Sequence, residues 1–576
     1  MRVVATAGHV DHGKSSLVQA LTGVNPDRFE EERRRGLTID LGFAHMPSSG
    51  GIDLSFIDVP GHVRFLRNML AGVGGVDACM FVIAATEGWK PQSEEHLRIL
   101  QLLGLRHGVV VLTKVDLVAP DFAELQALEV RDRLAGTFLV DAPIVPVSST
   151  TGAGLDELRS TLAALIAATP AARDRGRPRL WIDRVFAAKG SGTVVTGTLT
   201  DGSIAVEDQL LAGAHQVRVR GIQSHGEARE AIGPGNRVAL NLAGVDHTQL
   251  QRGDAVVRAA QWRPTSRFDA GLTVLPSLTH AVSRRGAYVA YIGSGEFAVR
   301  LRVLGHESIA AGQSGLVRLH VTTSSPLPLL PGDRFVLRES GRDETVGGGE
   351  VLDVAPKLPA SRARPDRDVD RVISEHGWLS VDDFEGMTGE RRDATVGSWV
   401  VSAAQLEATE RALQDRVANA GELGLDIAAL VERERAVLNA MSVQGGIAIE
   451  NGRARMAGTR DPLKDHPFVA ALLAGRFAPP DASVVDKAQL RELVRRQLIV
   501  ERDGVHFHPD AVAAAAQVAA ALLKSNLQGF TVSQFREALG NTRKHALPLA
   551  AELDATGVTR RRDDVRIGGP KLPPIR

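Results

Sequence analysis

The sequence predicts a multidomain protein: an α/β domain on a parallel sheet, then two β-barrel domains, then tandem winged-helix (α+β) domains. Three observations support this prediction. A chain of 576 residues is too long for a single hydrophobic core. Apolar strand-like runs alternate with helical stretches only in the first part of the chain. Turn-rich β-type sequence in the middle then gives way to helices that are followed by hairpin signals.

Residues 1–171 form the first expected domain. Apolar runs such as RVVATA, LSFIDV, CMFVIAA and GVVVLT alternate there with helical stretches such as EEHLRILQLL. This alternation predicts a parallel sheet covered by helices. The segment TPAARDRGRPR that follows is rich in Pro, Gly and charge, which predicts a linker.

The remaining chain divides into a β-rich and a helical part. Short β-branched runs separated by PGN, RGD and PGD turns predict two small barrels, at residues 172–260 and 261–357. From 358 to 576 helices precede hairpins whose turns fall at Asn451-Gly452, Asp503-Gly504 and near Asp563-Asp564. This unit recurs about every 50 to 60 residues. The arrangement is typical of winged-helix domains, and the last one is expected at about 513–576.

Composition narrows the class of protein. Lys plus Arg number 68, as do Asp plus Glu, so any contact with nucleic acid must come from a local patch. The single cysteine, Cys79, lies in an apolar run and cannot build a disulfide framework. No apolar run suits a bilayer span. We therefore expect a cytoplasmic protein with no membrane partner. We also expect a monomer.

The stretch GHVDHGKS fits the phosphate-binding loop G-x-x-x-x-G-K-[ST], and it lies between an apolar strand and a helical run, as that loop requires. Gly8 and Gly13 allow the tight turn that aims backbone N–H groups at phosphate oxygens. Lys14 would contact the β- and γ-phosphates. The Ser15 hydroxyl would bind Mg²⁺.

Two later segments add the parts of a nucleotide switch. FIDVPGH places Asp58 at a strand end within reach of the magnesium shell, and it places Gly61 where its N–H approaches the γ-phosphate. RGLTID offers Thr38, whose hydroxyl joins Mg²⁺ once the γ-phosphate is present. Such a segment orders with the triphosphate and relaxes after hydrolysis.

The segment LTKVD indicates which base is bound. The Asp116 carboxylate would accept from N1 and N2 of guanine, donors that adenine lacks, while the stem of Lys114 covers the ring. By itself TKVD is equally an ordinary strand-end turn, and VSST at 147–150 adds weak support. GTP or GDP with Mg²⁺ are therefore the expected cofactors. The expected nucleotide contacts are Gly8, His9, Val10, Asp11, His12, Gly13, Lys14, Ser15, Ser16, Asp58, Gly61, Thr113, Lys114, Asp116, Ser148 and Ser149, and the expected metal ligands are Ser15, Thr38 and Asp58.

These motifs together carry a family resemblance. GHVDHGKSS, RRGLTID, DVPGH and TKVD resemble the G domain of translational GTPases of the elongation factor Tu group, and WIDRVFAAKGSGTVVTGTLTDGSI resembles the barrel that follows it. With its helical C-terminal part the chain is most similar to the bacterial selenocysteine-specific elongation factors, the SelB family. The first two domains match strongly and the rest only in pattern. The resemblance implies a ribosome-stimulated GTPase that binds selenocysteinyl-tRNA and a SECIS-type mRNA hairpin, and that delivers the tRNA to the ribosome at in-frame UGA codons.

The resemblance also assigns residues in the G domain. His62 would be catalytic, orienting the water that attacks the γ-phosphate. The guanine motif usually begins with Asn, but Thr113 stands there, as in the specialised factors. We expect this exchange to remove an amide that would bond guanine and brace the phosphate loop. The last motif, usually Ser-Ala, is Ser148-Ser149.

An aminoacyl pocket is implied in the second domain. A selenol ionises well below pH 7 whereas a serine hydroxyl stays neutral, so cationic side chains would distinguish the two. Arg184 and Arg237 fall in segments that line the pocket in the resembling factors, and Asp183 is expected to orient Arg184. Alternatively, both arginines are surface residues in solvated ion pairs. Phe43 would either close the pocket or pack into a core.

The last winged helix carries a basic cluster. Arg543 and Lys544 begin a helix, and Arg560, Arg561 and Arg562 lie on the adjoining wing, so we expect one compact basic face. In the family resembled, such a face grips the mRNA hairpin. Winged helices also bind DNA or proteins, and RRRDD is frequently a solvated turn.

Two further functions stay open at this point. An initiation-type GTPase would bind initiator tRNA instead. A nucleotide-switched DNA-binding regulator would use its winged helices on promoters, but the two barrels, which resemble tRNA-holding modules, argue against it.

Overall fold

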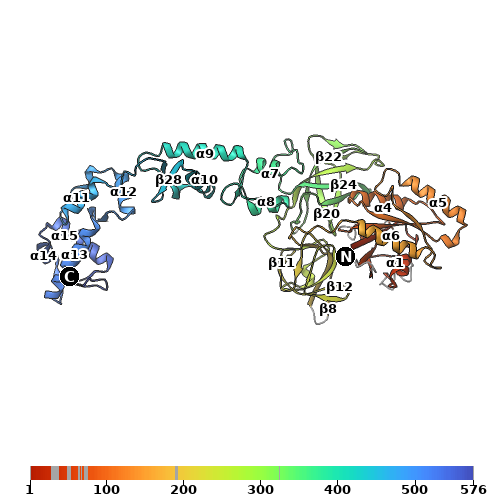
Figure 1. The fold of residues 1–576 in the computed structure, drawn as a ribbon, viewed down its shortest axis with the longest axis horizontal. Helices are drawn as coiled ribbons and strands as arrows, with labels where there is room; N and C mark the ends of the chain where they lie inside the picture. The colour runs from red at the N-terminus through yellow and green to blue at the C-terminus, as the bar shows by residue number, and fades with distance from the viewer. Residues whose placement is uncertain are drawn as a thin grey trace. The chain divides into compact units, whose positions relative to one another are not determined.

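The structure is a computed structural model that describes residues 2–26, 38–47, 53–62, 65, 68–70, 75–188, 192–323 and 325–574. The chain forms two compact units, and Figure 1 labels many of the helices and strands. The first unit comprises Met1–Ala394 with Trp399–Val401, and the second comprises Thr395–Ser398 with Ser402–Arg576.

The chain begins with a six-stranded sheet of order β2-β3-β1-β4-β5-β6, in which only β2 runs antiparallel to its neighbour. Strand β4 is buried along its whole length. Cys79 and Phe81 of β4 pack on one side of the sheet and Met80 on the other, so both faces are covered. The predicted α/β domain is confirmed. Its elements are β1 Arg2–Ala7, α1 Lys14–Thr22, β2 Gly42–Met46, β3 Leu54–Asp58, β4 Ala78–Ala84, α4 Pro91–Leu102, β5 Gly108–Thr113, η2 Val115–Leu117, α5 Pro120–Arg133, β6 Ile144–Pro146 and α6 Leu155–Ala168.

The first barrel follows the G domain directly. Its strands follow the path β11-β16-β7-β9-β15-β12, and a further pairing of β11 with β12 joins the two ends of that path. β8 pairs with β9 and β13 pairs with β12. The elements are β7 Arg179–Trp181, β8 Arg184–Ala188, β9 Gly192–Thr200, β10 Ile204–Ala205, β11 Gln209–Ala212, β12 His215–Ser224, β13 Glu227–Arg229, β14 Ala231–Ile232, β15 Asn236–Ala243, η3 His247–Gln249 and β16 Ala255–Val257.

The second barrel is closed, with strand order β17-β22-β20-β19-β23-β24. The two barrels predicted from the turn-rich sequence are therefore confirmed. The elements are β17 Arg267–Val274, β18 Val282–Ser283, β19 Tyr288–Ile292, β20 Gly295–Val303, β21 Ser308–Ile309, β22 Ser314–Val321, β23 Arg334–Glu339 and β24 Glu344–Asp353.

The first helical unit after the barrels packs as part of the second barrel's core, whereas the sequence predicts one region that contains it and all the later units. Ile373 and Phe384 share a hydrophobic core with Phe268 and Phe335 of the barrel. An amphipathic helix buries its apolar face against whichever surface is available, and here that surface is the barrel. The unit consists of α7 Val369–His376, β25 Leu379–Ser380, α8 Val381–Thr388 and β26 Trp399–Val400.

The second compact unit contains three successive sets of helices, each followed by a hairpin, as predicted. The hairpin turns lie at the predicted dipeptides, and Asn451, Gly452, Asp503, Gly504 and Asp563 all have positive φ. The first set comprises α9 Ala403–Ala418, β27 Leu425–Asp426, η4 Ile427–Ala429, α10 Glu432–Val443, β28 Ile447–Glu450 and β29 Arg453–Met456. The second comprises α11 Pro467–Gly475, η5 Ala482–Val484, α12 Lys487–Arg495, β30 Val500–Arg502 and β31 Val505–Phe507, and the third comprises α13 Pro509–Ser525, β32 Phe530–Thr531, α14 Val532–Leu539, α15 Arg543–Thr556, β33 Thr559–Arg562 and β34 Val565–Gly568.

Within the described part of the chain, no helix combines the length and the apolar character that a bilayer crossing requires.

Candidate nucleotide, aminoacyl and RNA sites

The phosphate loop connects β1 to α1 and depends on two glycines with positive φ. Gly8 has φ 136°, and a Cβ there would lie 2.2 Å from the Val82 carbonyl oxygen. Gly13 has φ 82° and precedes α1, whose first turn has no side-chain cap. The N–H groups at the start of a helix are the groups that bind anions in phosphate loops.

Lys14 lies across the loop. Its side chain is buried, and Nζ donates to the Gly8 carbonyl at 3.2 Å and the His9 carbonyl at 2.7 Å. Gly61 lies directly opposite, because a Cβ there would be 2.4 Å from Lys14 Nζ and 2.7 Å from the Val10 nitrogen. Only glycine fits at that position, which places its backbone against the loop as predicted.

The three expected metal ligands come together. Ser15 Oγ donates to Asp58 Oδ2 at 2.6 Å and lies 2.8 Å from Thr38 Oγ1. Thr6, which the sequence did not indicate, donates to Asp58 Oδ1 at 2.7 Å and accepts from the Val59 N–H at 3.0 Å. Two hydroxyls and a fixed carboxylate are oxygen donors of the kind that Mg²⁺ prefers.

Helix α4 supports the loop through two side chains that sequence reasoning missed. The Gly8 N–H donates to His96 Nδ1 at 3.1 Å, and the Val10 N–H donates to Gln92 Oε1 at 3.1 Å. Burial lowers the pKa of His96 to about 3, so its ring is neutral and accepts. Gln92 and His96 are four residues apart on one helix. This spacing, which places them on the same face, was the only sequence signal that the two side chains could act together.

His12 contributes to the loop through its backbone rather than its ring. The ring is buried, with Nδ1 3.2 Å from the Val82 carbonyl oxygen, and burial lowers its pKa to about 3. The neighbouring His9 ring lies 5.1 Å away, and burial lowers its pKa as well.

Thr113 of the guanine motif contacts the phosphate loop. Its hydroxyl donates to the His12 carbonyl at 2.7 Å and lies 3.3 Å from the Ile83 carbonyl oxygen. The exchange of Asn for Thr removes the amide, as expected, but the Thr113 hydroxyl at the end of β5 still reaches the loop.

The other guanine-site residues lie on adjacent strand ends. Lys114 has φ 59°, and its Nζ is 3.4 Å from Glu87 Oε1. Asp116 is exposed on the short helix η2. Ser148 is buried, and its hydroxyl accepts from the Thr151 N–H at 3.1 Å, while Ser149 is half-buried.

The residues expected to line an aminoacyl pocket lie around Phe43, which is near the start of β2 and packs partly against the G-domain core. The Arg237 guanidinium carbon lies 3.8 Å from the centre of the Phe43 ring, and that of Arg184 lies 4.7 Å from it. Phe43 therefore packs against a core, which was one of the two expectations for it. The ring is flanked by the two cations that were expected to read the amino acid.

Asp183 does not have its predicted role. It pairs with Arg237 through two hydrogen bonds, of 2.5 and 2.9 Å, and accepts from the Thr196 hydroxyl at 2.7 Å. Arg184 instead donates to Asp40 Oδ2 at 3.3 Å and to the Leu41 carbonyl. Asp183 lies in the bend between β7 and β8, whereas Arg184 is the first residue of β8, and the two side chains meet different partners.

His62 directly follows Gly61, and its ring lies 6.1 Å from that of Phe65. The neighbouring residues 63–64 lie outside the described ranges, as do 34–37 of the RRGLTID motif.

The basic residues of the last helical set lie on two elements. Arg543 and Lys544 are exposed in the first turn of α15. Arg560, Arg561 and Arg562 are exposed along β33. Because strand side chains alternate, Arg561 points away from the other two, and its Nε donates to the Asp563 carbonyl at 3.2 Å. The three arginines therefore do not share a single face, contrary to expectation.

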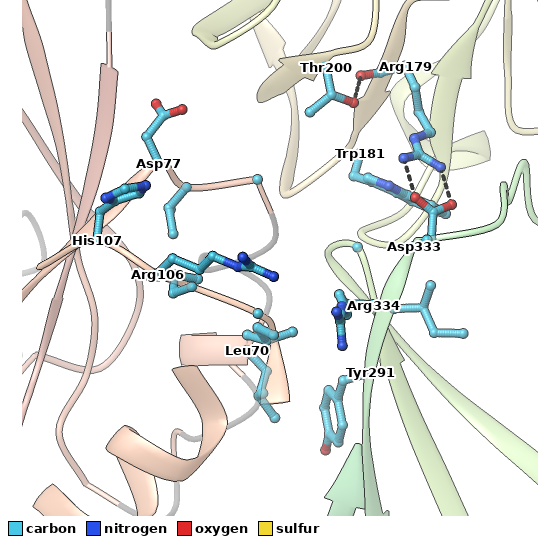
Figure 2. A pocket seen from close by; sticks show the side chains of 18 of the residues that line it. Leu70, Asp77, Arg106, His107, Arg179, Trp181, Thr200, Tyr291, Asp333 and Arg334 are labelled. Atoms are coloured by element: carbon cyan, nitrogen blue, oxygen red, sulfur yellow. Dashed lines mark hydrogen bonds and ion pairs between the residues drawn. The ribbon is translucent and has the colours of Figure 1, made fainter. Parts of the chain in front are cut away.

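A cavity of about 450 Å³ lies between the G domain and the two barrels, and its lining is drawn in Figure 2. Arg179 on its barrel side pairs with Asp333 at 2.6 and 2.7 Å. Arg106 and Arg334 lie on opposite walls. Sequence reasoning did not indicate this junction, because its lining residues lie far apart in the chain.

Comparisons with known proteins agree with this arrangement. Residues 1–168 match a family model described as elongation factor Tu GTP binding domain, residues 277–358 one described as selenocysteine-specific elongation factor, beta-barrel domain, and residues 521–567 one described as elongation factor SelB, winged helix. The chain is 43% identical over 352 residues to a selenocysteine-specific elongation factor of Desulfomicrobium baculatum, which covers 61% of this chain and 55% of that relative. The chain therefore spans about half the length of that curated relative.

In two further matches the chain covers a larger share of the matched protein. The chain is 31% identical to elongation factor Tu 2 of Streptomyces avermitilis, covering 61% of this chain and 96% of that protein. A crystal structure titled as a bacterial selenocysteine-specific elongation factor matches its fold with a TM-score of 0.72 at 24% identity, covering 98% of this chain and 99% of the other. The chain belongs to the elongation factor Tu group of translational GTPases and, within it, to the selenocysteine-specific (SelB) family.

Proposed function

We propose that this protein is a translation elongation factor that binds GTP and selenocysteinyl-tRNA and delivers the tRNA to the ribosome at in-frame UGA codons. It hydrolyses GTP when the ribosome stimulates it, and it recognises an mRNA hairpin through its C-terminal winged helices. It acts as a cytoplasmic monomer. The names of the relatives support this function, and the residues around Phe43 support its substrate specificity.

The nucleotide site supports a GTP-driven switch. Lys14 and the N–H groups of the first turn of α1 would hold the phosphates, and Asp116 would accept from guanine. Ser15, Thr38 and Asp58 would hold Mg²⁺, which supplies charge for the phosphoryl oxygens. The His62 imidazole would orient the attacking water.

The observation that carries the specificity is the pair of guanidiniums on one aromatic ring, Arg184 and Arg237 at Phe43. A selenolate brings a negative charge to these cations, whereas a serine hydroxyl does not. One charge-assisted hydrogen bond is worth about 1.5 to 3 kcal/mol, so a single contact already discriminates about ten- to a hundredfold. Two contacts would suffice for strong discrimination.

The direct test compares selenocysteinyl-, cysteinyl- and seryl-forms of one tRNA with the protein bound to a non-hydrolysable GTP mimic. We expect the selenocysteinyl form to bind most tightly at pH 7. The cysteinyl form should tighten as the pH rises through about 8.5, where a thiol ionises. Equal affinities for all three forms at every pH would contradict the proposed function.

Arg184→Ala tests the pocket itself. It should weaken binding of selenocysteinyl-tRNA about tenfold or more while changing seryl-tRNA binding little, because only the first ligand uses the charge. Arg220→Ala is the matched control, since Arg220 is exposed on β12 of the same barrel. Equal losses for the two tRNAs would refute the pocket assignment.

A further inference from the structure

The segment 38–43 connects the metal-binding hydroxyl to the aminoacyl pocket. Thr38 lies at Ser15, Asp40 and the Leu41 carbonyl bind Arg184, and Phe43 stacks against the same guanidinium. Phe43 is five positions after Thr38, a span of at most about 18 Å for an extended chain. A displacement of Thr38 can therefore be transmitted to the pocket through a short stretch of backbone.

The two arginines of the pocket are held in different ways. Arg237 is paired within its own barrel, because its partner Asp183 belongs to the same domain and is buried. Arg184 begins β8 of the barrel but is held by Asp40 and Leu41 of the G domain. Both guanidiniums contact Phe43, but of the two only Arg184 donates hydrogen bonds to the segment that contains Thr38.

The hydrogen bonds of Arg184 leave it able to meet a ligand. Among the described residues, both of its side-chain hydrogen bonds start from Nη2. A guanidinium carries five N–H groups, so Nη1 and Nε remain for an anion. Asp40 thus holds the Arg184 guanidinium at Nη2 and leaves Nη1 and Nε available to a ligand.

We propose that Asp40 is a positioning residue that couples the nucleotide state to the selenocysteine pocket, by holding Arg184 against Phe43 only while Thr38 is at the metal site. This inference rests on the proposed function. When the γ-phosphate leaves, Thr38 is released, Asp40 moves with it, and one of the two charge-reading arginines loses its orientation. The affinity for selenocysteinyl-tRNA then falls by more than the loss that comes from contacts with the rest of the tRNA.

The test uses the full chain with Asp40→Asn, which keeps the shape of the side chain and removes its charge. Affinities for selenocysteinyl- and seryl-tRNA are measured with the GTP mimic and with GDP. We expect selenocysteinyl-tRNA binding in the GTP-mimic form to weaken about two- to fivefold, the range for a partly exposed ion pair. Seryl-tRNA binding in both forms and selenocysteinyl-tRNA binding in the GDP form should not change.

Two controls separate positioning from a general structural effect. Asp53→Asn removes the same charge next to β3, beside His45 at 3.6 Å, and should alter neither tRNA affinity. In an Arg184→Ala background, Asp40→Asn should add no further loss, because it acts through Arg184. Additive losses would overturn the proposal, as would equal losses for both tRNAs.

The outcome also distinguishes this inference from the proposed function. If the unaltered protein with the GTP mimic does not prefer selenocysteinyl- over seryl-tRNA, the proposed function fails and the coupling fails with it. If the unaltered protein has that preference and Asp40→Asn retains it in full, only the coupling is refuted.

Discussion

The phosphate loop of the G domain and the arginine strand β33 of the last helical set both present positive charge, but they are built in opposite ways. Lys14 is buried and held by two carbonyls, and the loop around it is fixed by His96, Gln92 and Thr113. Arg560, Arg561 and Arg562 are exposed on a hairpin. In the proposed function the loop would therefore select its ligand by geometry, whereas the strand would attract RNA by charge that solvent screens.

This difference predicts different responses to mutation and to salt. A buried, fixed cation should be indispensable and little affected by ionic strength. Exposed arginines should contribute in small steps that salt weakens. Each prediction below tests one side of the comparison.

The largest effect is expected from Lys14→Ala. Loss of a buried ammonium at the phosphates should lower GTP affinity about a hundredfold or more, and by the same factor at low and high salt. Nucleotide titration measures both. Lys90→Ala is the control, since Lys90 lies just before α4 and outside the loop. A loss that disappears at high salt would show that Lys14 acts as a surface charge.

On the strand, replacing Arg560, Arg561 and Arg562 together with Ala should weaken binding of the mRNA hairpin about tenfold or more and lower the log–log salt slope by about 2. The measurement is RNA affinity across a salt series. Arg433→Ala with Arg435→Ala, on exposed positions of α10, provides a control in another helical set. An unchanged slope would remove β33 from the RNA interface.

Thr113→Val should remove one hydrogen bond that supports the phosphate loop. The variant keeps the shape of the side chain but leaves the buried His12 carbonyl without its 2.7 Å partner, which should cost about 1 to 3 kcal/mol of G-domain stability. Denaturant unfolding measures it. Thr113→Ser keeps the hydroxyl and should recover most of the loss. If Val and Ser behave alike, the hydroxyl does not brace the loop.

The smallest effect concerns the buried His96. Its folded pKa of about 3 lies below the unfolded value of 6.5, so the unfolded chain binds more protons between these values and stability falls as the pH drops from 6.5. His96→Gln keeps an acceptor for the Gly8 N–H and removes the titration. The free energy of unfolding should then lose about 1 kcal/mol less between pH 7 and pH 5.5. Equal pH dependence in both proteins would contradict a neutral buried ring.

The comparison also shows what the sequence allowed to be predicted. The loop was predicted residue by residue, because a strand, two glycines, a lysine and a helix start are contiguous in the chain. Its supports Thr6, Gln92 and His96 were not predicted, since they reach the loop only after the sheet and α4 are assembled. For β33 the hairpin was predicted, but the direction of each arginine was not.

The residues of the proposed aminoacyl pocket were predicted less completely than the phosphate loop and more completely than the arginine directions on β33. Phe43, Arg184 and Arg237 were named from a resemblance, and the structure brings them together. The partner of Asp183 was misassigned, because the side chain of this bend residue pairs with Arg237 of β15, 54 residues further along the chain, and not with its sequence neighbour. Likewise, the first helical unit was separated from the barrel, since nothing local in its sequence indicates which surface it covers.

The most direct test of the account is the affinity of the protein for selenocysteinyl-tRNA with a non-hydrolysable GTP mimic and with GDP under identical conditions. The account predicts tight binding with the mimic and much weaker binding with GDP, since Thr38 and the pocket it is linked to follow the γ-phosphate. The same affinity in both nucleotide states would contradict it.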